Sequence, residues 1–214
     1  MLNYSISAAK DTEASFPRSA YVHIPFCRRR CYYCDFPVSV VGDRIRGDNS
    51  GTIRQYVQAL CQEIITIGAQ TLPLETVFFG GGTPSLLSPK QLSQILKVLN
   101  QQIKIAANAE ISMEIDPGTF VREQLQGYRN AGVNRISLGV QAFQEELLRA
   151  CGRSHSVTDI FTSVEVIRQV GFPEFSLDLI SGLPHQTLAQ WQESLEKAIA
   201  FSPTHISVYD LVVE

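Results

Sequence analysis

The chain contains no apolar run that approaches the ~20 residues needed to cross a bilayer. Its first 19 residues are polar and include Asp11 and Glu13, so they lack the apolar segment of a secretory signal peptide. An excess of either charge is also missing, since the formal net charge is -3, and this gives no sign of a nucleic-acid partner. Together these absences predict a soluble, cytoplasmic protein with no membrane span.

A disulfide framework is lacking too. The chain has five cysteines, an odd number of which three are clustered, and this indicates a reducing compartment. Outside the cluster, Cys61 and Cys151 are expected to be plain buried thiols. With 214 residues the chain can bury a sizeable core, and we expect one folded unit over residues 19–214 after a disordered segment at 1–18.

Three cysteines lie within eight positions, at Cys27, Cys31 and Cys34. Thiolates are the soft ligands that iron-sulfur clusters, zinc and copper prefer, so this spacing indicates a metal site. We expect the three arginines at positions 28–30 to lower the pKa values of the thiols and to offset the charge of a thiolate-ligated cluster. Closed sites use four protein ligands, whereas three leave one metal position open to a substrate or cofactor.

Two other interpretations fit the same cysteines. Zinc could be held by the three thiolates together with His23, although His23 precedes the first cysteine and lacks the usual zinc-finger spacing. The cysteines could also be core thiols, although three core cysteines rarely share so short a polar segment. A metal site with an open position is therefore favoured, with zinc as the alternative metal.

Short apolar or alternating runs predict six strands, at residues 19–25, 75–79, 110–115, 133–138, 174–179 and 204–209. Helical patterns separate these strands, and the alternation predicts a parallel sheet with right-handed crossovers. Capping boxes at Ser88 with Gln91 and at Thr187 with Gln190 mark two helix starts. The predicted apolar stripes are Val57, Leu60, Ile64 and Ile67 on the first helix and Leu188, Trp191, Leu195 and Ile199 on the last.

The predicted strands carry one polar face. Inner strands of a doubly wound sheet are covered on both sides and are apolar throughout, and closed eight-stranded barrels fill their interior with Val, Ile and Leu. An open, incomplete barrel that holds a polar cofactor fits better. Satisfied polar groups in a packed core are the alternative, but buried carboxylates are costly without partners. The polar residues expected to face the barrel interior are Tyr21, His23, Glu114, Ser137, Gln141, Asp178, His205 and Tyr209.

The cysteine spacing, Cys-x3-Cys-x2-Cys after a short strand with an aromatic before the last cysteine, resembles the signature of the radical S-adenosylmethionine (SAM) superfamily. The segments Tyr-Val-His-Ile-Pro-Phe-Cys and Cys-Asp-Phe are similar to one branch, which contains oxygen-independent coproporphyrinogen III oxidase and the haem chaperones of the HemW type. The resemblance implies a [4Fe-4S] cluster on the three cysteines, with SAM on the fourth iron. It also implies an α/β fold, a partial (β/α)6 TIM-like barrel with an open side.

Further segments resemble the motifs by which this superfamily contacts SAM. They are the Gly-Gly-Gly-Thr-Pro run from Gly80, Glu-x-Asp-Pro from Glu114, Ser-x-Gly-Val-Gln-x-Phe from Ser137 and Asp-Leu-Ile-x-Gly-Leu-Pro from Asp178. By this resemblance Arg153 would pair with the methionine carboxylate, and Asp178 would meet the adenosine. The SAM-binding set that the resemblance implies is Tyr21, Tyr33, Gly81, Gly82, Thr83, Glu114, Gln141, Arg153 and Asp178.

One position separates the two branches. The oxidase pattern has a further cysteine two places after the last cluster cysteine, and here that place is Phe36. The resemblance therefore favours a haem chaperone that delivers haem to acceptor proteins, over an oxidase that decarboxylates propionates of coproporphyrinogen III with an electron donor such as flavodoxin or ferredoxin. A radical SAM enzyme with another substrate is a further alternative. The chain ends at Glu214 without a counterpart of the family's C-terminal domain.

Overall fold

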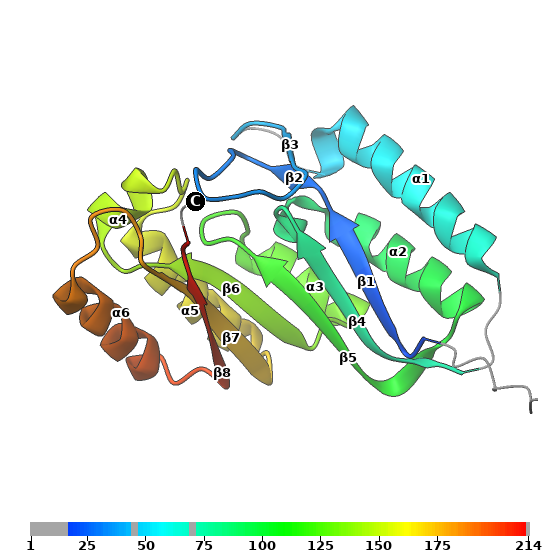
Figure 1. Cartoon of the computed structure of the whole chain (residues 1–214). Helices are drawn as coiled ribbons and strands as arrows, with labels where there is room; N and C mark the ends of the chain where they lie inside the picture. The colour runs from blue at the N-terminus through cyan, green and yellow to red at the C-terminus, as the bar shows by residue number, and fades with distance from the viewer. Residues whose placement is uncertain (1–16, 44–46, 69–71, 213–214) are drawn as a thin grey trace, which may run out of the picture.

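A computed structural model describes residues 17–43, 47–68 and 72–212 (Figure 1). Six strands form a sheet in which every neighbouring pair is parallel, in the order β1-β4-β5-β6-β7-β8. These strands are β1 Ser19–Ile24, β4 Leu74–Gly81, β5 Ile105–Ile115, β6 Arg135–Gln141, β7 Glu174–Ser181 and β8 His205–Asp210. All six predicted strands are present, while the expected disordered segment at 1–18 lies almost wholly outside the described residues.

Helices connect successive strands, as parallel neighbours require. They are α1 Gly51–Ile67, α2 Pro89–Gln102, α3 Arg122–Ala131, α4 Glu145–Ala150, α5 Val157–Val170 and α6 Leu188–Ala200. The long helices lie on one side of the curved sheet and leave its other side open, with β1 and β8 at the two edges (Figure 1). Over the described ranges, no helix is long and apolar enough to cross a membrane.

The helix-covered side of the sheet holds the core. Phe79, Met113, Ile136 and Leu177 are completely buried there, one from each central strand. The alternate residues on the same strands are mostly polar or small, with Phe78 and Ile180 as exceptions, because side chains on a strand point to opposite faces. The predicted incomplete barrel, with apolar residues under the helices and a polar interior, is thus confirmed as an open α/β sheet.

Both predicted capping boxes are present. The Ser88 hydroxyl accepts a bond from the Gln91 amide N–H, and the Gln91 side chain accepts one from the Ser88 N–H. The same reciprocal pair joins Thr187 and Gln190 at the start of α6. These local signals are reliable because the first N–H groups of a helix have no carbonyl partner within the helix, and the capping side chains accept hydrogen bonds from them.

The predicted apolar stripes need correction. Helix α1 begins earlier, at the N-cap Ser50, and its buried face is Ile53, Val57, Cys61 and Ile64, while Ile67 is exposed. On α6, Trp191 and Leu195 are half-buried against the core, as predicted. Leu188 and Ile199, at the two ends of the predicted stripe, are 81% and 64% exposed, and Ser194 and Ala198 are fully buried. Helix α6 packs on β7, next to the edge strand β8 of the sheet. Periodicity identifies an apolar stripe but not what packs on it.

Some elements were not predicted. Strand β5 begins at Ile105 rather than at residue 110, and β6 runs to Gln141 through a register shift after Gly139. The segment after the first strand forms a two-residue parallel pair of β2 Phe26–Cys27 with β3 Ser39–Val40, followed by the 3-10 turn η1 Gly47–Asn49. A second such turn, η2 Pro84–Leu86, follows β4. Elements this short leave no periodic pattern in a sequence.

Candidate functional site

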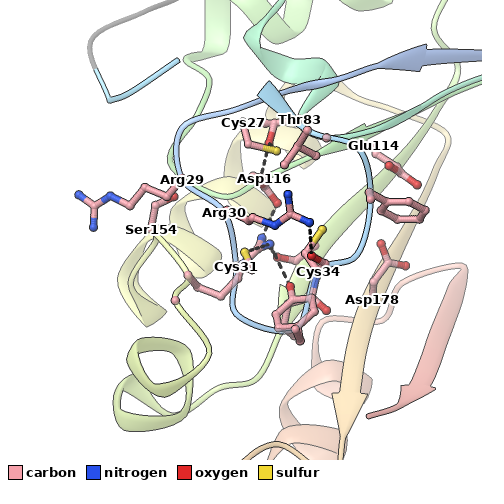
Figure 2. A pocket seen from close by; sticks show the side chains of 18 of the residues that line it. Cys27, Arg29, Arg30, Cys31, Cys34, Thr83, Glu114, Asp116, Ser154 and Asp178 are labelled. Carbon is pink, nitrogen blue, oxygen red and sulfur yellow. Dashed lines mark hydrogen bonds and ion pairs between the residues drawn. The ribbon is translucent and has the colours of Figure 1, made fainter. Parts of the chain in front are cut away.

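The carboxyl ends of the strands open into a cavity of about 420 Å³. Its walls come from the loop that carries the three clustered cysteines, here called the cysteine loop (residues 27–34), and from the ends of β4 to β8. In the close view, Cys27, Cys31 and Cys34 surround the cavity with Asp116 among them, and Glu114 and Asp178 lie to one side (Figure 2). Parallel strands collect functional groups at this end because their connecting loops converge there.

All three clustered cysteines are free thiols that line the cavity and are partly buried. The pair β2–β3 fixes the start of the loop, and the Tyr32 N–H donates to the Cys151 carbonyl at 3.0 Å further along. The Thr83 hydroxyl lies 3.7 Å from the Cys27 sulfur. The fold therefore brings together the three cysteines that the sequence singled out, in one wall of one cavity.

The expectation that the arginines at 28–30 lower the thiol pKa values is wrong for Cys27. Burial raises the pKa of Cys27 to about 11. Arg29 points away from the cavity and pairs with Asp43 at 2.8 Å, and Arg30 donates to the Cys34 carbonyl at 3.0 Å (Figure 2). A guanidinium that faces a thiol comes instead from a distant part of the chain, Arg153, whose Nη1 lies 3.7 Å from the Cys31 sulfur.

The zinc alternative finds no support in the geometry. His23 lies against Gly81, where an added Cβ would sit 2.6 Å from the imidazole, and its Nδ1 is 3.3 Å from the Tyr21 hydroxyl. Among the residues that the structure describes, no three His, Cys, Asp or Glu side chains gather around a point that one ion could occupy. A cubane cluster binds each thiolate through a different iron. It therefore suits thiols that lie further apart than the ligands of a single ion.

The glycine run at the end of β4 is required by close packing. A Cβ on Gly82 would lie 2.7 Å from the Phe26 carbonyl oxygen and 2.9 Å from the Cys27 sulfur, closer than any side chain allows. The N–H groups of residues 81–83 are bonded within the protein, to the Glu114 carboxylate at 3.1 Å and to the carbonyls of Ile24 and Phe26. The glycines thus bring the strand end against the cysteine loop.

Two carboxyl groups stand in the cavity with perturbed acidity. Burial is the largest cause that raises the pKa of Glu114 to about 7. The bond from the Gly81 N–H opposes this rise, and the charges of Asp178 and Asp116 add to it. Burial also raises the pKa of Asp178, which accepts from the Ser137 hydroxyl at 2.9 Å. Both groups line the cavity, so they are not merely satisfied polar groups of a packed core.

Arg153 is the most heavily engaged side chain of the site. Its guanidinium pairs with Asp116, donates to the Gly139 carbonyl at 2.9 Å and contacts the Tyr33 hydroxyl at 3.3 Å. Its side chain is only 8% exposed, yet its Nε has no hydrogen-bond partner within the described part of the chain. A buried, unpartnered donor in a cavity wall fits an anionic group of a ligand.

The remaining expected site residues divide into two groups. Tyr33, Gly81, Gly82, Thr83 and Gln141 line the cavity, whereas Tyr21 is 58% exposed and does not. His23 and His205 also lie outside its lining. Gln141 reaches the cavity because it takes a left-handed conformation with φ 67° at the bulge that ends β6.

Two members of the site had no role assigned from the sequence. Asp116 lies inside the quoted Glu-x-Asp-Pro segment, and Gly139 lies inside the Ser-x-Gly-Val-Gln segment. A Cβ on Gly139 would lie 3.0 Å from the Asp116 carboxylate and 3.2 Å from the Arg153 guanidinium. The motif positions were visible, but the contacts between them depend on the fold.

Comparison with known proteins gives a family match and close relatives. The family model described as the radical SAM superfamily matches residues 21–198. This chain belongs to that superfamily. Its members use a [4Fe-4S] cluster and SAM, so the three free thiols around an open cavity and the unpartnered Arg153 donor fit the group that the family carries.

The relatives come from both branches. A "Heme chaperone HemW" of Synechocystis is 54% identical over 92% of this chain and 48% of its own length. An "Oxygen-independent coproporphyrinogen III oxidase" of Bradyrhizobium diazoefficiens is 34% identical over 89% of this chain and 42% of its own length. The solved coproporphyrinogen III oxidase (HemN) of Escherichia coli covers 91% of this chain and 44% of its own, with a TM-score of 0.80 and 34% identity. The chain spans about half the length of the curated relatives it matches.

Proposed function

We propose that this chain binds a [4Fe-4S] cluster through Cys27, Cys31 and Cys34 and binds SAM beside it, within a haem chaperone that passes haem to acceptor proteins. The observation that carries the cofactor assignment is three free thiols in one wall of a cavity that is also lined by Glu114 and Arg153. When bound, the reduced cluster and SAM supply one-electron chemistry. The cofactor-binding core is residues 19–214, as the sequence predicts.

The residues that hold SAM in this proposal are the expected ones that line the cavity. Glu114 and Gln141 offer a carboxylate and an amide, Asp178 offers a carboxylate further along, and the free Nε of Arg153 suits a carboxylate of the ligand. Gly81, Gly82 and Thr83 form the wall beside Cys27. Tyr33 lines the same cavity as Cys31. Tyr21 is left out of the proposed SAM-binding set because it does not line the cavity.

Cluster binding has a direct test. Cys31→Ala is expected to lose the cluster, because two thiolates cannot hold three irons, while Cys61→Ala on α1 retains it. The measurement is iron and sulfide content and visible absorbance after anaerobic reconstitution. Retention of the full cluster spectrum by the Cys31 variant would contradict the ligand assignment.

The haem assignment rests on sequence similarity and on side chains that line the cavity. This chain is 54% identical to the Synechocystis chaperone over 92% of its length, and Phe36 occupies the position where the oxidase pattern has cysteine. Phe36 and Tyr209 line the cavity although they are 58% and 59% exposed, and Arg30 is part of the same lining. Apolar rings with a nearby cation suit a flat apolar molecule that carries carboxylates, as a tetrapyrrole does.

Haem titration of the cluster-loaded protein, followed by the change in haem absorbance, tests this assignment. Arg30→Ala is expected to weaken haem binding about tenfold, the cost of one charge-assisted hydrogen bond, without affecting the dimethyl ester of haem. Arg54→Ala on the surface of α1 is the matched control. No saturable haem binding by the unaltered chain would refute the haem assignment while leaving the cofactors in place.

The second candidate is the oxidase, favoured by the TM-score of 0.80 with the solved E. coli enzyme. It predicts methionine, 5'-deoxyadenosine and vinyl-bearing porphyrinogen when coproporphyrinogen III and a flavodoxin or ferredoxin reductant are supplied. Product analysis by mass spectrometry separates the two. Haem binding without decarboxylation favours the chaperone.

A further inference from the structure

One carboxylate, Asp116, makes two contacts that reach different parts of the site. Its Oδ2 accepts a hydrogen bond from the Thr83 hydroxyl at 3.0 Å. Its Oδ1 forms an ion pair with the Arg153 guanidinium. Thr83 follows β4 and Arg153 follows α4, so Asp116 at the end of β5 joins two segments that are far apart in sequence.

Each of these two contacts leads on to a different cysteine. The Thr83 hydroxyl lies 3.7 Å from the Cys27 sulfur, and Arg153 Nη1 lies 3.7 Å from the Cys31 sulfur. Arg153 also contacts the hydroxyl of Tyr33, which lies between Cys31 and Cys34. The two routes from Asp116 therefore end on two of the three thiols.

Asp116 is itself held firmly. Its backbone carbonyl accepts from the Thr119 hydroxyl at 2.6 Å, and its N–H faces the Ser85 hydroxyl at 3.3 Å. Ser85 and Thr119 are bonded to each other at 2.6 Å and are buried. The carboxylate thus sits on a turn fixed by buried hydroxyls. The backbone of the cysteine loop is fixed by the short β2–β3 pair, by the Tyr32 bond to Cys151 and by local bonds to the carbonyls of Cys31 and Cys34.

We propose that Asp116 is the positioning residue of the cysteine loop: through Thr83 and Arg153 it holds Cys27 and Cys31 at the cavity and sets the charge that the cluster meets. This inference rests on the proposed cluster. Groups that orient metal ligands from behind commonly alter metal affinity by 10- to 100-fold, and charges and hydrogen bonds near the sulfurs tune cluster potentials. Asp116 does not contact a thiol, and its effect passes through its two partners.

The test compares Asp116→Asn with Glu110→Gln. Glu110 is the matched control because it lies on the same strand and pairs with Arg135 at 3.1 Å, away from the thiols. After anaerobic reconstitution, the cluster of Asp116→Asn is expected to lose iron to a ferrous chelator at least tenfold faster than that of the unaltered chain. Its midpoint potential is expected to rise, because a negative charge near the cluster is lost. The control is expected to match the unaltered chain in both measurements.

A cluster-free measurement keeps the inference separate from the proposed function. In the protein without cluster, iodoacetamide is expected to alkylate Cys27 and Cys31 faster in Asp116→Asn, while Cys34, which neither Thr83 nor Arg153 contacts through its sulfur, is expected to keep its rate. Mass spectrometry resolves the three sites. Thr83→Val removes only the route to Cys27. It is expected to change the alkylation rate of Cys27 and to leave that of Cys31 unchanged, and it serves if the Asp116 variant does not fold.

The outcomes are distinct. The inference would be overturned if Asp116→Asn and the unaltered chain had the same rate of iron loss, midpoint potential and alkylation rates. It would also be overturned if Glu110→Gln changed these quantities as much as Asp116→Asn does. A protein that takes up no cluster, but whose Cys27 and Cys31 respond to the Asp116 substitution, would refute the proposed function and support the positioning role.

Discussion

At the scale of single residues, the surroundings of Glu114 disfavour its ionised form. It shares the cavity with Asp178 and Asp116, and burial is the largest cause of its raised pKa. In an unfolded chain the same carboxyl ionises near its ordinary value of 4.5, whereas in the folded protein it keeps its proton to about 7. Stability from this group is therefore fully present below pH 4.5 and is lost as the pH rises through 7.

Glu114→Gln removes that dependence. The variant is expected to gain stability relative to the unaltered chain as the pH rises, by up to about 3 kcal/mol at pH 8, from the conversion of 1.36 kcal/mol per pKa unit. Urea unfolding of the cluster-free protein at pH 5 and pH 8 under reducing conditions measures it. A stability difference between the two proteins that is the same at both pH values would contradict the prediction.

His155 has the opposite dependence. Burial and the nearby Arg153 charge lower its pKa to about 4 from 6.5, so the folded protein keeps this ring neutral. Stability from His155 is present above pH 6.5 and is lost as the pH falls through 4, because the unfolded chain takes up the proton first. Between pH 7.5 and pH 4.5, His155→Gln is expected to lose less free energy of unfolding than the unaltered chain loses. Circular dichroism melts between pH 4.5 and 7.5 provide the check.

Residue types and spacing predicted most of the site, but not its internal pairing. The three cysteines, the glycine run and Glu114 were found because each lies in a local motif. Arg153 was expected to face the ligand alone, and its pairing with Asp116 could not be foreseen, because the two residues meet only when β5 and the segment after α4 are folded together. The arginines at 28–30 misled for the same reason, since proximity in sequence does not fix where a long side chain points.

At the scale of elements, a single glycine joins the segment after the cysteine loop to α2. The Gly47 carbonyl accepts from the Gln91 amide at 3.1 Å, while the same Gln91 caps the helix with Ser88. A Cβ at Gly47 would lie 2.0 Å from the Gln91 Oε1 and 2.6 Å from the Ser88 N. The backbone of η1 therefore sits directly against the helix start.

Gly47→Ala is expected to lower the free energy of unfolding by about 1–3 kcal/mol, the usual cost of overpacking a filled site. Gly51→Ala is the matched control. Its Cβ would meet only the Arg54 guanidinium at 3.9 Å, and alanine favours a helix, so a gain of up to about 1 kcal/mol is expected. Chemical denaturation of the two variants compares them, and a Gly47 variant as stable as the Gly51 variant would count against the packing argument.

Elements with their own local signals were predictable. The strands and capping boxes follow from alternation and from N–H groups at helix starts. The bulge that turns Gln141 toward the cavity and the β2–β3 pair were not predictable, because they are fixed by neighbouring strands rather than by local sequence. The exposure of Leu188 and Ile199 on α6 was not predictable either, since burial depends on what lies opposite.

At the scale of the whole molecule, the sheet has a narrow junction. Strands β5 and β6 pair only over Ser112–Ile115 with Arg135–Leu138, whereas β1 with β4 and β7 with β8 pair over six positions each. The cavity spans this junction, with Glu114 on one side and Ser137, Gln141 and Asp178 on the other. A ligand that fills the cavity therefore links the two halves of the sheet.

Loading the proposed cofactors is expected to slow backbone hydrogen exchange most at that junction, in residues 112–115 and 135–138. A ligand that binds only the folded state also stabilises the whole protein, by about 2.7 kcal/mol at a hundredfold excess over its Kd. That global gain protects every strand alike, so the junction is the distinguishing region. The comparison is hydrogen exchange by mass spectrometry of the cluster-free protein and of the cluster-loaded protein with SAM. Strand β1, which does not line the cavity, is the internal reference. If protection were confined to the cysteine loop, the cofactors would order the loop without linking the two halves of the sheet. That result would refute the proposed link across the β5–β6 junction.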